Sequence, residues 1–114
     1  MDQINRIYAA LGNEVRLEIV QLLALRHESC ACELVELLGL STTAVSYHIA
    51  RLRDAGLVEE EKRGRWRVLR LNRRVLEQFA PPLAEKLASL PGEDFPPLEE
   101  RIGCPSVGAP ASDN

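Results

Sequence analysis

The chain has 114 residues, a formal net charge of -3 and three cysteines. This length allows one domain with a single hydrophobic core, and it is short enough that dimerisation would help to bury apolar surface. No run of about 18 apolar residues is present, and the first residues lack the basic and apolar regions of a signal peptide. We therefore expect a cytoplasmic protein without a membrane span. Its cysteines are expected to be core, ligand or redox residues rather than a structural disulfide framework.

Two amphipathic helices are predicted at the start of the chain. A first helix ending near Gly12 is indicated by apolar residues at helical spacing, namely Ile4, Ile7, Tyr8 and Leu11. Asn13 is a good N-cap for a second helix. The broad apolar face of this second helix consists of Val15, Leu17, Ile19, Val20, Leu22 and Leu23. Both helices are expected to form scaffold.

Cys30 and Cys32 lie just before the next helix pattern, which covers residues 33–38. On a regular helix, side chains two residues apart point about 200° away from each other. Both sulfurs can therefore bind one ion only if at least one cysteine lies at a non-helical start, which is where the sequence places them. Backbone N–H groups at a helix start favour thiolates, so we expect this pair to be more reactive than buried thiols.

Residues 33–38 and 41–56 predict two short helices joined by a turn that contains Gly39. The second helix has a narrow apolar stripe at i, i+4 and i+7, formed by Val45, Ile49 and Leu52. Ser41 is a good N-cap for it, and Gly56 follows its last periodic turn. Such a pair is a helix–turn–helix, whose second helix enters the DNA major groove.

A β-hairpin with basic residues around its tip follows the second helix. Its predicted strands are residues 57–62 and 66–71, with Gly64 at the turn. Nine basic residues fall between Arg51 and Arg74, against four acidic ones. A basic stripe confined to a helix and a hairpin is the expected footprint of phosphate binding. The alternative is a solvated charged surface. We interpret the hairpin as the wing of a winged helix–turn–helix.

Four stretches resemble the ArsR/SmtB family of metalloregulatory repressors: residues 11–17, 45–49, 52–58 and 64–66. The resemblance implies a mainly α fold with a β-hairpin wing and a homodimer formed through the first and last helices. It also implies a transcriptional repressor that binds palindromic double-stranded operator DNA. We accordingly expect no enzyme and no catalytic cofactor. In this family the arginine that matches Arg16 lies near the DNA backbone; a surface ion pair is the alternative interpretation.

The resemblance also implies a thiol metal site, because residues 30–34, Cys-Ala-Cys-Glu-Leu, are similar to the Cys-Val-Cys-Asp-Leu form of these repressors. The inducer would be As(III) or Sb(III), soft ions that prefer about three thiolates. Val35 occupies the position of the third cysteine in the best-known arsenic pattern. Cys104 is therefore the remaining candidate metal ligand beside Cys30 and Cys32, from its own subunit or the dimer mate. Alternatively, a small thiol or water completes the pair and Cys104 is free.

Other sensing chemistries are tested against the same residues. Zinc sensing on the last helix is excluded, because that site needs Asp and His ligands and the only histidines are His27 and His48. A cadmium or lead sensor of the same family is an alternative, although no cysteine precedes Cys30. A thiol-based redox-responsive repressor would use the same cysteines. A DNA-binding module with inert cysteines is a further alternative. A thiol oxidoreductase would need a substrate pocket and a Cys-x-x-Cys pair on a βαβ pattern, and neither is visible.

The polar face of the second helix supplies candidate DNA contacts. Side chains near the N-terminal end of such a helix usually read bases, which selects Thr42, Thr43, Ser46 and Tyr47. The candidates for the phosphate backbone are His48, Arg51, Arg63 and Arg65. For His48 the alternative is a hydrogen-bonded helix residue. Thr42 stands where the family commonly has glutamine, so the operator half-site cannot be copied from relatives.

The end of the chain divides into a helix and a tail. Asn72 is predicted to cap a last helix, which Pro81-Pro82 should kink or divide. Residues 1–90 are expected to form the DNA-binding and dimerisation domain. Residues 91–114, which lack periodicity and are rich in helix breakers, are expected to form a flexible C-terminal tail carrying Cys104.

Overall fold

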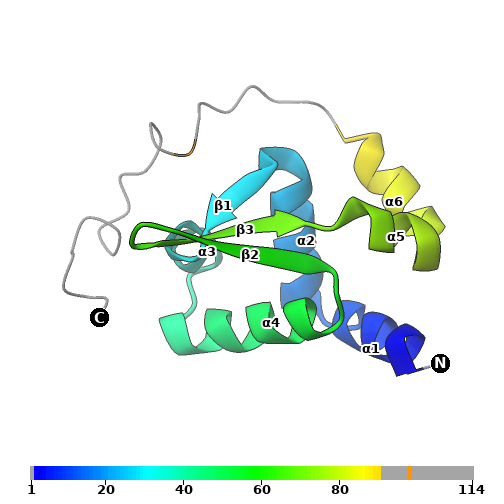
Figure 1. Ribbon diagram of the computed structural model, residues 1–114, viewed down its shortest axis with the longest axis horizontal. Coiled ribbons are helices and arrows are strands. Elements are labelled where there is room, and N and C mark those ends of the chain that lie inside the picture. The colour runs from blue at the N-terminus through cyan, green and yellow to red at the C-terminus, as the bar shows by residue number, and fades with distance from the viewer. Residues whose placement is uncertain (1, 91–97, 99–114) are drawn as a thin grey trace.

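A computed structural model describes residues 2–90 and 98 of the chain (Figure 1). Within these residues it contains six helices and three strands. The helices are α1 Asp2–Leu11, α2 Glu14–Arg26, α3 Ala31–Leu38, α4 Thr42–Asp54, α5 Arg73–Phe79 and α6 Pro81–Ala88. The strands are β1 Glu28–Cys30, β2 Val58–Arg63 and β3 Trp66–Leu71. The predicted mainly α fold with a β-hairpin wing is confirmed.

Helices α2 and α4 begin at the predicted caps. The side chain of Asn13 accepts a hydrogen bond from the Arg16 amide at 3.1 Å, and Ser41 Oγ accepts one from Ala44 at the same distance. Each cap satisfies an amide that has no partner within its helix. At the end of α3, Gly39 has a φ of 67°, a left-handed conformation that glycine adopts without steric cost.

The core lies between the helices and the inner face of the sheet. Its fully buried large side chains include Ile7, Ile19, Leu23, Ile49, Leu52 and Leu69. The prediction that Leu17 belongs to the apolar face of α2 is wrong, because its side chain is exposed. Leu17 precedes Ile19 by two residues and so points to nearly the opposite side of the helix.

The sheet has one strand more than the predicted hairpin. All pairs are antiparallel in the order β1-β3-β2, and Cys30 of β1 lies opposite Val68 of β3. The hairpin itself is confirmed, with Arg63 opposite Trp66 and a two-residue turn whose Gly64 has a φ of 64°. The sequence does not reveal β1, because three residues are too few to show a strand periodicity.

The predicted last helix is divided at the two prolines, as expected. Ala80 separates α5 from α6, and Pro81 and Pro82 lie in the first turn of α6, where their missing amide donors cost nothing. The Tyr8 hydroxyl of α1 donates to the Phe79 carbonyl and so connects the first helix to α5. In residues 2–90 and 98, no helix is both long and apolar enough to cross a membrane.

Candidate nucleic-acid interface and thiol pair

Helix α4 turns one face to the core and the other outward. The core-facing residues are Val45, Ile49 and Leu52, all buried as their spacing predicts. Of the side chains predicted to read bases, Ser46 is half-buried, and the exposed ones are Thr42, Thr43 and Tyr47. Arg51, about one turn beyond Tyr47, is also exposed. The structure thus places these candidates on one helix; their contact with DNA stays a prediction.

Glu60 of β2 connects α4 to the wing. Its carboxylate accepts hydrogen bonds from Arg53 of α4 at 2.8 Å and from Arg67 of β3 at 2.7 Å. The Arg67 hydrogen bond is the main reason why the pKa of Glu60 lies below its usual value. Arg67 also donates to Ser46 Oγ at 3.3 Å. Through Arg67, the wing therefore contacts Ser46, one of the side chains predicted to read bases.

Arg16, in the first turn of α2, contacts both the end of α1 and His48. Its Nε donates to the Ala10 carbonyl at 2.7 Å, and Nη1 lies 3.1 Å from His48 Nδ1. A guanidinium has donors only, so Nδ1 must be the acceptor and the ring proton is on Nε2. Burial, and then the Arg16 charge, lower the pKa of His48. The surface ion pair suggested for Arg16 is wrong, because helix-end carbonyls and an imidazole are its partners here.

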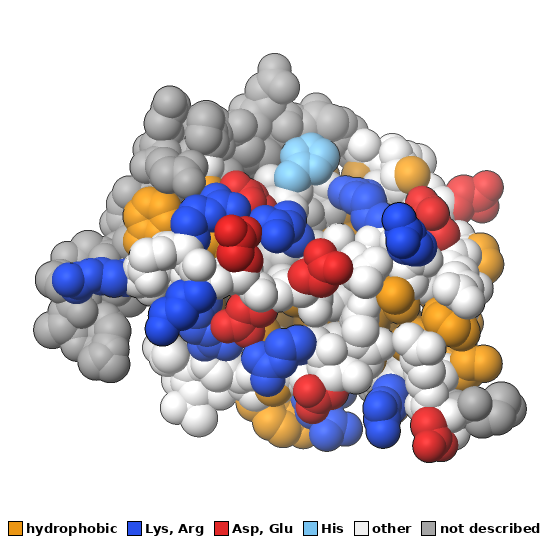
Figure 2. All heavy atoms as spheres, in the orientation of Figure 1, with side chains coloured by type: hydrophobic (Ala, Val, Ile, Leu, Met, Phe, Trp, Pro, Cys, Tyr) orange, Lys and Arg blue, Asp and Glu red, His pale blue; other side chains and the backbone are white. Residues whose placement is uncertain are grey.

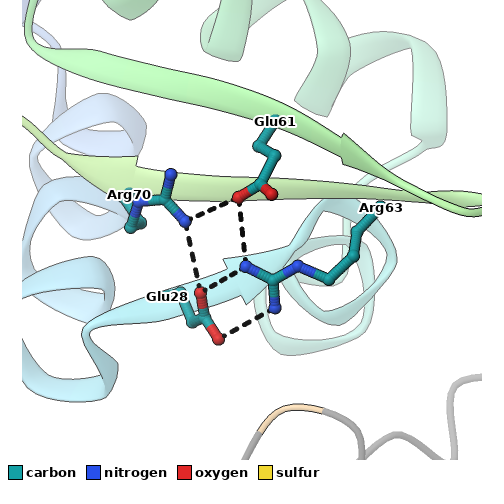
Figure 3. A network of polar contacts seen from close by, with 4 residues as sticks. All are labelled: Glu28, Glu61, Arg63 and Arg70. Atoms are coloured by element: carbon teal, nitrogen blue, oxygen red, sulfur yellow. Dashed lines mark hydrogen bonds and ion pairs between the residues drawn. The ribbon is translucent and has the colours of Figure 1, made fainter.

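Four side chains form an ionic network on the outer face of the sheet (Figure 3). Arg63 donates to both carboxylate oxygens of Glu28, at 3.2 and 3.1 Å, and to Glu61 at 3.1 Å. Arg70 donates to Glu61 at 2.8 Å and to Glu28 at 3.4 Å. Hydrogen bonds from Arg63 lower the pKa of Glu28, and those from Arg70 and Arg63 lower the pKa of Glu61. Three strands are joined by these contacts.

The two arginines at the wing tip, both predicted to bind phosphate, differ in their ion pairing. Arg63 is engaged by the ionic network, whereas Arg65 is exposed and has no ion-pair partner within the described part of the chain. Arg65 therefore keeps its charge available to a ligand. For Arg63, any phosphate contact would compete with two carboxylates.

The basic stripe is weaker than the sequence indicates. Several of its arginines are paired with carboxylates, namely Arg53, Arg63, Arg67 and Arg70. On the face shown in Figure 2, basic and acidic side chains alternate rather than forming a patch of one sign. The sequence count missed this because the acids Glu60 and Glu61 lie on the strand next to the arginines of β3. The remaining exposed basic residues include Arg51, Lys62, Arg65 and Arg74.

Cys30 and Cys32 come together where β1 ends and α3 begins. Cys30 is the N-cap of α3, with extended backbone angles, and Cys32 is the second residue of the helix. The two sulfurs are joined in a disulfide, with 5.4 Å between the Cα atoms. The predicted non-helical start is confirmed, and it allows the two sulfurs to meet. A bridge across so short a loop adds little to stability, so it is no structural framework.

The two cysteines of the pair differ in exposure. Cys30 is only 1% exposed, and Cys32 is half-buried. The sequence predicts that the pair is more reactive than buried thiols; the burial of Cys30 opposes this for Cys30, and the reactivity of both thiols stays a prediction. Cys30 is buried because strand β1 places it on the outer face of the sheet beside Val68, within a small apolar cluster. Leu98, itself fully buried, packs in the same cluster, and Trp66 and Cys32 lie against it.

A buried serine also holds the start of α3. Ser29 Oγ donates to the Glu33 carboxylate at 2.6 Å, and Arg26 lies 3.6 Å from the same carboxylate. These contacts join α2, β1 and α3 immediately around the cysteines. The sequence does not reveal these contacts, because only the pairing of β1 shows that the Ser29 side chain points into the protein.

Two converging sulfurs supply part of the set of about three thiolates that a soft trivalent ion prefers. Among residues 2–90 and 98, no group of three or more His, Cys, Asp or Glu side chains is placed to hold a metal ion. Cys104, the candidate third ligand, lies outside the described residues.

Comparisons with known proteins agree with this architecture. Residues 13–60 match the model of the family described as bacterial regulatory protein, arsR family. The arsenic resistance transcriptional regulator of Pseudomonas putida is 35% identical over 66 residues, which cover 58% of this chain and 52% of that protein. The arsenical resistance operon repressor of Escherichia coli is 39% identical over 67 residues, covering 59% and 57%. The match thus spans about half the length of these relatives.

A solved structure extends the likeness over most of the fold. HlyU from Vibrio cholerae is 30% identical, with a TM-score of 0.64, and the match covers 77% of this chain and 95% of HlyU. A structure of reduced HlyU matches with a TM-score of 0.57. The two sequence relatives are transcriptional regulators and not enzymes. The family match, the covered length of HlyU and the winged helix–turn–helix architecture lead to one conclusion: the chain belongs to the arsR family of bacterial regulatory proteins.

Proposed function

We propose that this protein is a homodimeric transcriptional repressor that binds a palindromic operator and is released when As(III) or Sb(III) binds its cysteines. The observation that carries the proposal is the convergence of Cys30 and Cys32 at the start of α3, the first helix of the helix–turn–helix. Relatives described as arsenical resistance repressors support the same inducer class.

In this proposal, α4 lies in the major groove with four side chains toward the bases: Thr42, Thr43, Ser46 and Tyr47. Arg51 of α4 and Arg65 at the tip of the wing contact phosphates, because both are exposed cations. His48 contributes a neutral N–H donor from Nε2, since its Nδ1 is occupied by Arg16. Arg63 makes a smaller contribution to phosphate binding, because its guanidinium is shared with Glu28 and Glu61.

Inducer and DNA would be linked through the position of α3. Each thiol proton leaves with a hydroxide of arsenite as water while a sulfur–arsenic bond forms. In the reduced form that binds DNA the two sulfurs are not bonded to each other; an arsenic atom bonded to both draws them together and so moves the start of α3. Because α3 packs against α4 and β1 pairs with β3, the reading helices change their spacing. Ligand and DNA then favour different conformations, so each weakens the other.

Cys104 is proposed as the third ligand. Leu98 lies beside Cys30, and Cys104 follows it by six residues, a span of at most about 20 Å even when fully extended. Such a span is long enough for Cys104 to reach the thiol pair of its own subunit, and the pair of the dimer mate is the alternative. If it is a ligand, Cys104→Ser weakens arsenite binding without abolishing the response.

The test is fluorescence anisotropy of the reduced protein on DNA from upstream of its own gene. We expect arsenite to lower the DNA affinity of the wild type by roughly 5–150-fold, the usual range of coupling between two sites. Cys30→Ser and Cys32→Ser should bind DNA like the wild type but should not respond to arsenite. The control is the same DNA with one half-site scrambled. An undiminished response of Cys30→Ser would contradict the proposal.

A redox-responsive repressor is the second candidate, and the disulfide between Cys30 and Cys32 is the observation that favours it. A reduced form of the structural neighbour HlyU is also known. In this case peroxide would release the DNA and dithiothreitol would restore binding, whereas arsenite would have no effect. Release by cadmium or lead alone would instead support the related metal-sensor alternative.

A further inference from the structure

We propose that Leu98 is a hydrophobic cap over the thiol pair, which controls the access of ligands to Cys30. Leu98 and Val68 are fully buried, and Cys30 is 1% exposed in the same cluster. Trp66 and Cys32 pack against this cluster at its border. Leu98 is the short coloured segment in the otherwise grey end of the trace in Figure 1.

The strand register explains why Cys30 needs a cover. Cys30 and Val68 are opposite each other in the sheet, so their side chains project from the same face. The neighbouring pair, Ser29 and Leu69, projects to the opposite face, which is the core side. Cys30 therefore lies on the outer face of the sheet, and a residue from outside the sheet contributes to its burial.

The surroundings of the cap are charged. On the same outer face, Glu28 precedes Cys30 by two residues and joins the ionic network of Figure 3. Because Glu61 is opposite Val68 and Arg63 is opposite Trp66 in the sheet, this network borders the apolar cluster. The apolar cover is thus confined to the thiol pair. A hydrated ion loses favourable interactions with water when it enters such a site, whereas a small uncharged molecule loses much less.

Capping has a thermodynamic consequence. A ligand that bonds to both sulfurs must contact Cys30, and it occupies space next to Leu98. Binding therefore favours molecules in which Leu98 is displaced, and displacement of Leu98 favours binding by the same factor. The role as an inducer gate rests on the proposed function, but the shielding itself concerns only the thiols and is tested without DNA or arsenite.

The experiment measures the rate of thiol modification in the reduced full-length chain carrying Cys104→Ser, so that only the pair reacts. Two reagents are used: methyl methanethiosulfonate, which is small and neutral, and 5,5′-dithiobis(2-nitrobenzoate), which is bulky and doubly negative. Leu98→Ala should raise the rate with the bulky reagent by about tenfold or more, since a truncated leucine packs less tightly over the thiols. The rate with the small reagent should rise less.

The matched control is Leu90→Ala, which truncates a partly buried leucine that packs against the main core instead. It should leave both rates unchanged. Repeating the measurement with Cys32→Ser isolates Cys30, where the effect should be largest. If Leu98→Ala and the protein with Leu98 intact are modified at equal rates by both reagents, the proposal is overturned.

Trp66 provides a second readout, because it is the single tryptophan of the chain and packs against the cluster that contains Leu98. Its emission should shift to longer wavelength in Leu98→Ala, and Leu98→Met should restore both the emission and the slow reaction. If Leu98→Ala fails to fold by circular dichroism, the milder Leu98→Val is measured instead. Unchanged emission together with unchanged rates in Leu98→Val would also overturn the cap.

Failure of the cap and failure of the proposed function remain distinguishable. If Leu98 protects the thiols but arsenite does not release DNA, the proposed function is wrong and the cap stands. If arsenite releases DNA while the thiols of Leu98→Ala react at the original rate, the proposed function stands and the cap is wrong.

Discussion

At the scale of single residues, His48 shows how a neighbour sets a chemical role. Arg16 caps the end of α1 through the Ala10 carbonyl and presents a second N–H to His48 Nδ1. Burial of the ring and the nearby positive charge both oppose protonation, so the pKa of His48 lies below its ordinary value. Any contact of His48 with a phosphate at neutral pH would therefore be a neutral hydrogen bond.

Arg16→Met should raise the pKa of His48, because it removes the neighbouring positive charge, while burial still keeps the value below normal. As pH falls through about 6.5, the unfolded chain binds a proton that folded His48 does not, so stability present above that pH decreases. This decrease should be smaller in Arg16→Met. The measurement is an NMR titration of the ring, assigned with His48→Gln, together with urea unfolding at pH 7 and 5. Identical titration in both proteins would contradict the assignment.

At the scale of elements, the reading helix and the wing are coupled by Glu60. Its carboxylate joins Arg53 of α4 to Arg67 of β3, and Arg67 continues to Ser46. Long-range side-chain contacts of this kind position two elements that only a short connection links in sequence. The wing is therefore presented to a ligand at a defined angle to α4.

Glu60→Gln should destabilise the fold modestly, by about 0.5–1 kcal/mol, because the pairs are partly exposed and screened by solvent. It should also increase hydrogen exchange at the Ser46 end of α4 and in the wing. Glu59→Gln on the exposed neighbouring position is the matched control. The measurement is urea unfolding with hydrogen exchange by mass spectrometry, and equal effects of the two variants would count against the coupling.

At the scale of the whole molecule, net charge and charge pairing decide how DNA would be bound. The chain is acidic overall, and three of the four basic residues on strands β2 and β3 are paired with nearby carboxylates. Binding would then depend on a few unpaired cations at the wing tip and on α4. Such a surface gives limited nonspecific affinity, because few phosphates are neutralised.

Arg65→Ala should weaken binding to all DNA sequences alike and reduce the slope of log affinity against log salt by about 2 for a dimer that loses two phosphate contacts. Arg63→Ala should change this slope less, because Glu28 and Glu61 already use the charge. Anisotropy titrations over a range of salt concentrations check both variants. A larger slope change for Arg63→Ala would show that the ionic network opens on DNA.

The sequence by itself determined the features that depend on residues close to one another. The caps at Asn13 and Ser41, the break at the two prolines and the glycine turn of the hairpin all follow from local backbone chemistry. The apolar stripe of α4 and the non-helical start at Cys30 follow from side-chain spacing in the same way. These are the features that locate the reading helix, the wing and the thiol pair.

Only the tertiary structure decided which distant groups meet. Strand β1 exists because β3, about forty residues later, supplies its hydrogen bonds. The same pairing puts Glu28 against Arg63 and Arg70, which removes two cations from the predicted basic stripe. It also turns Cys30 to a face that Leu98 helps to cover. Pairing between segments far apart in the chain depends on how the core assembles, and no local pattern of residues carries that information.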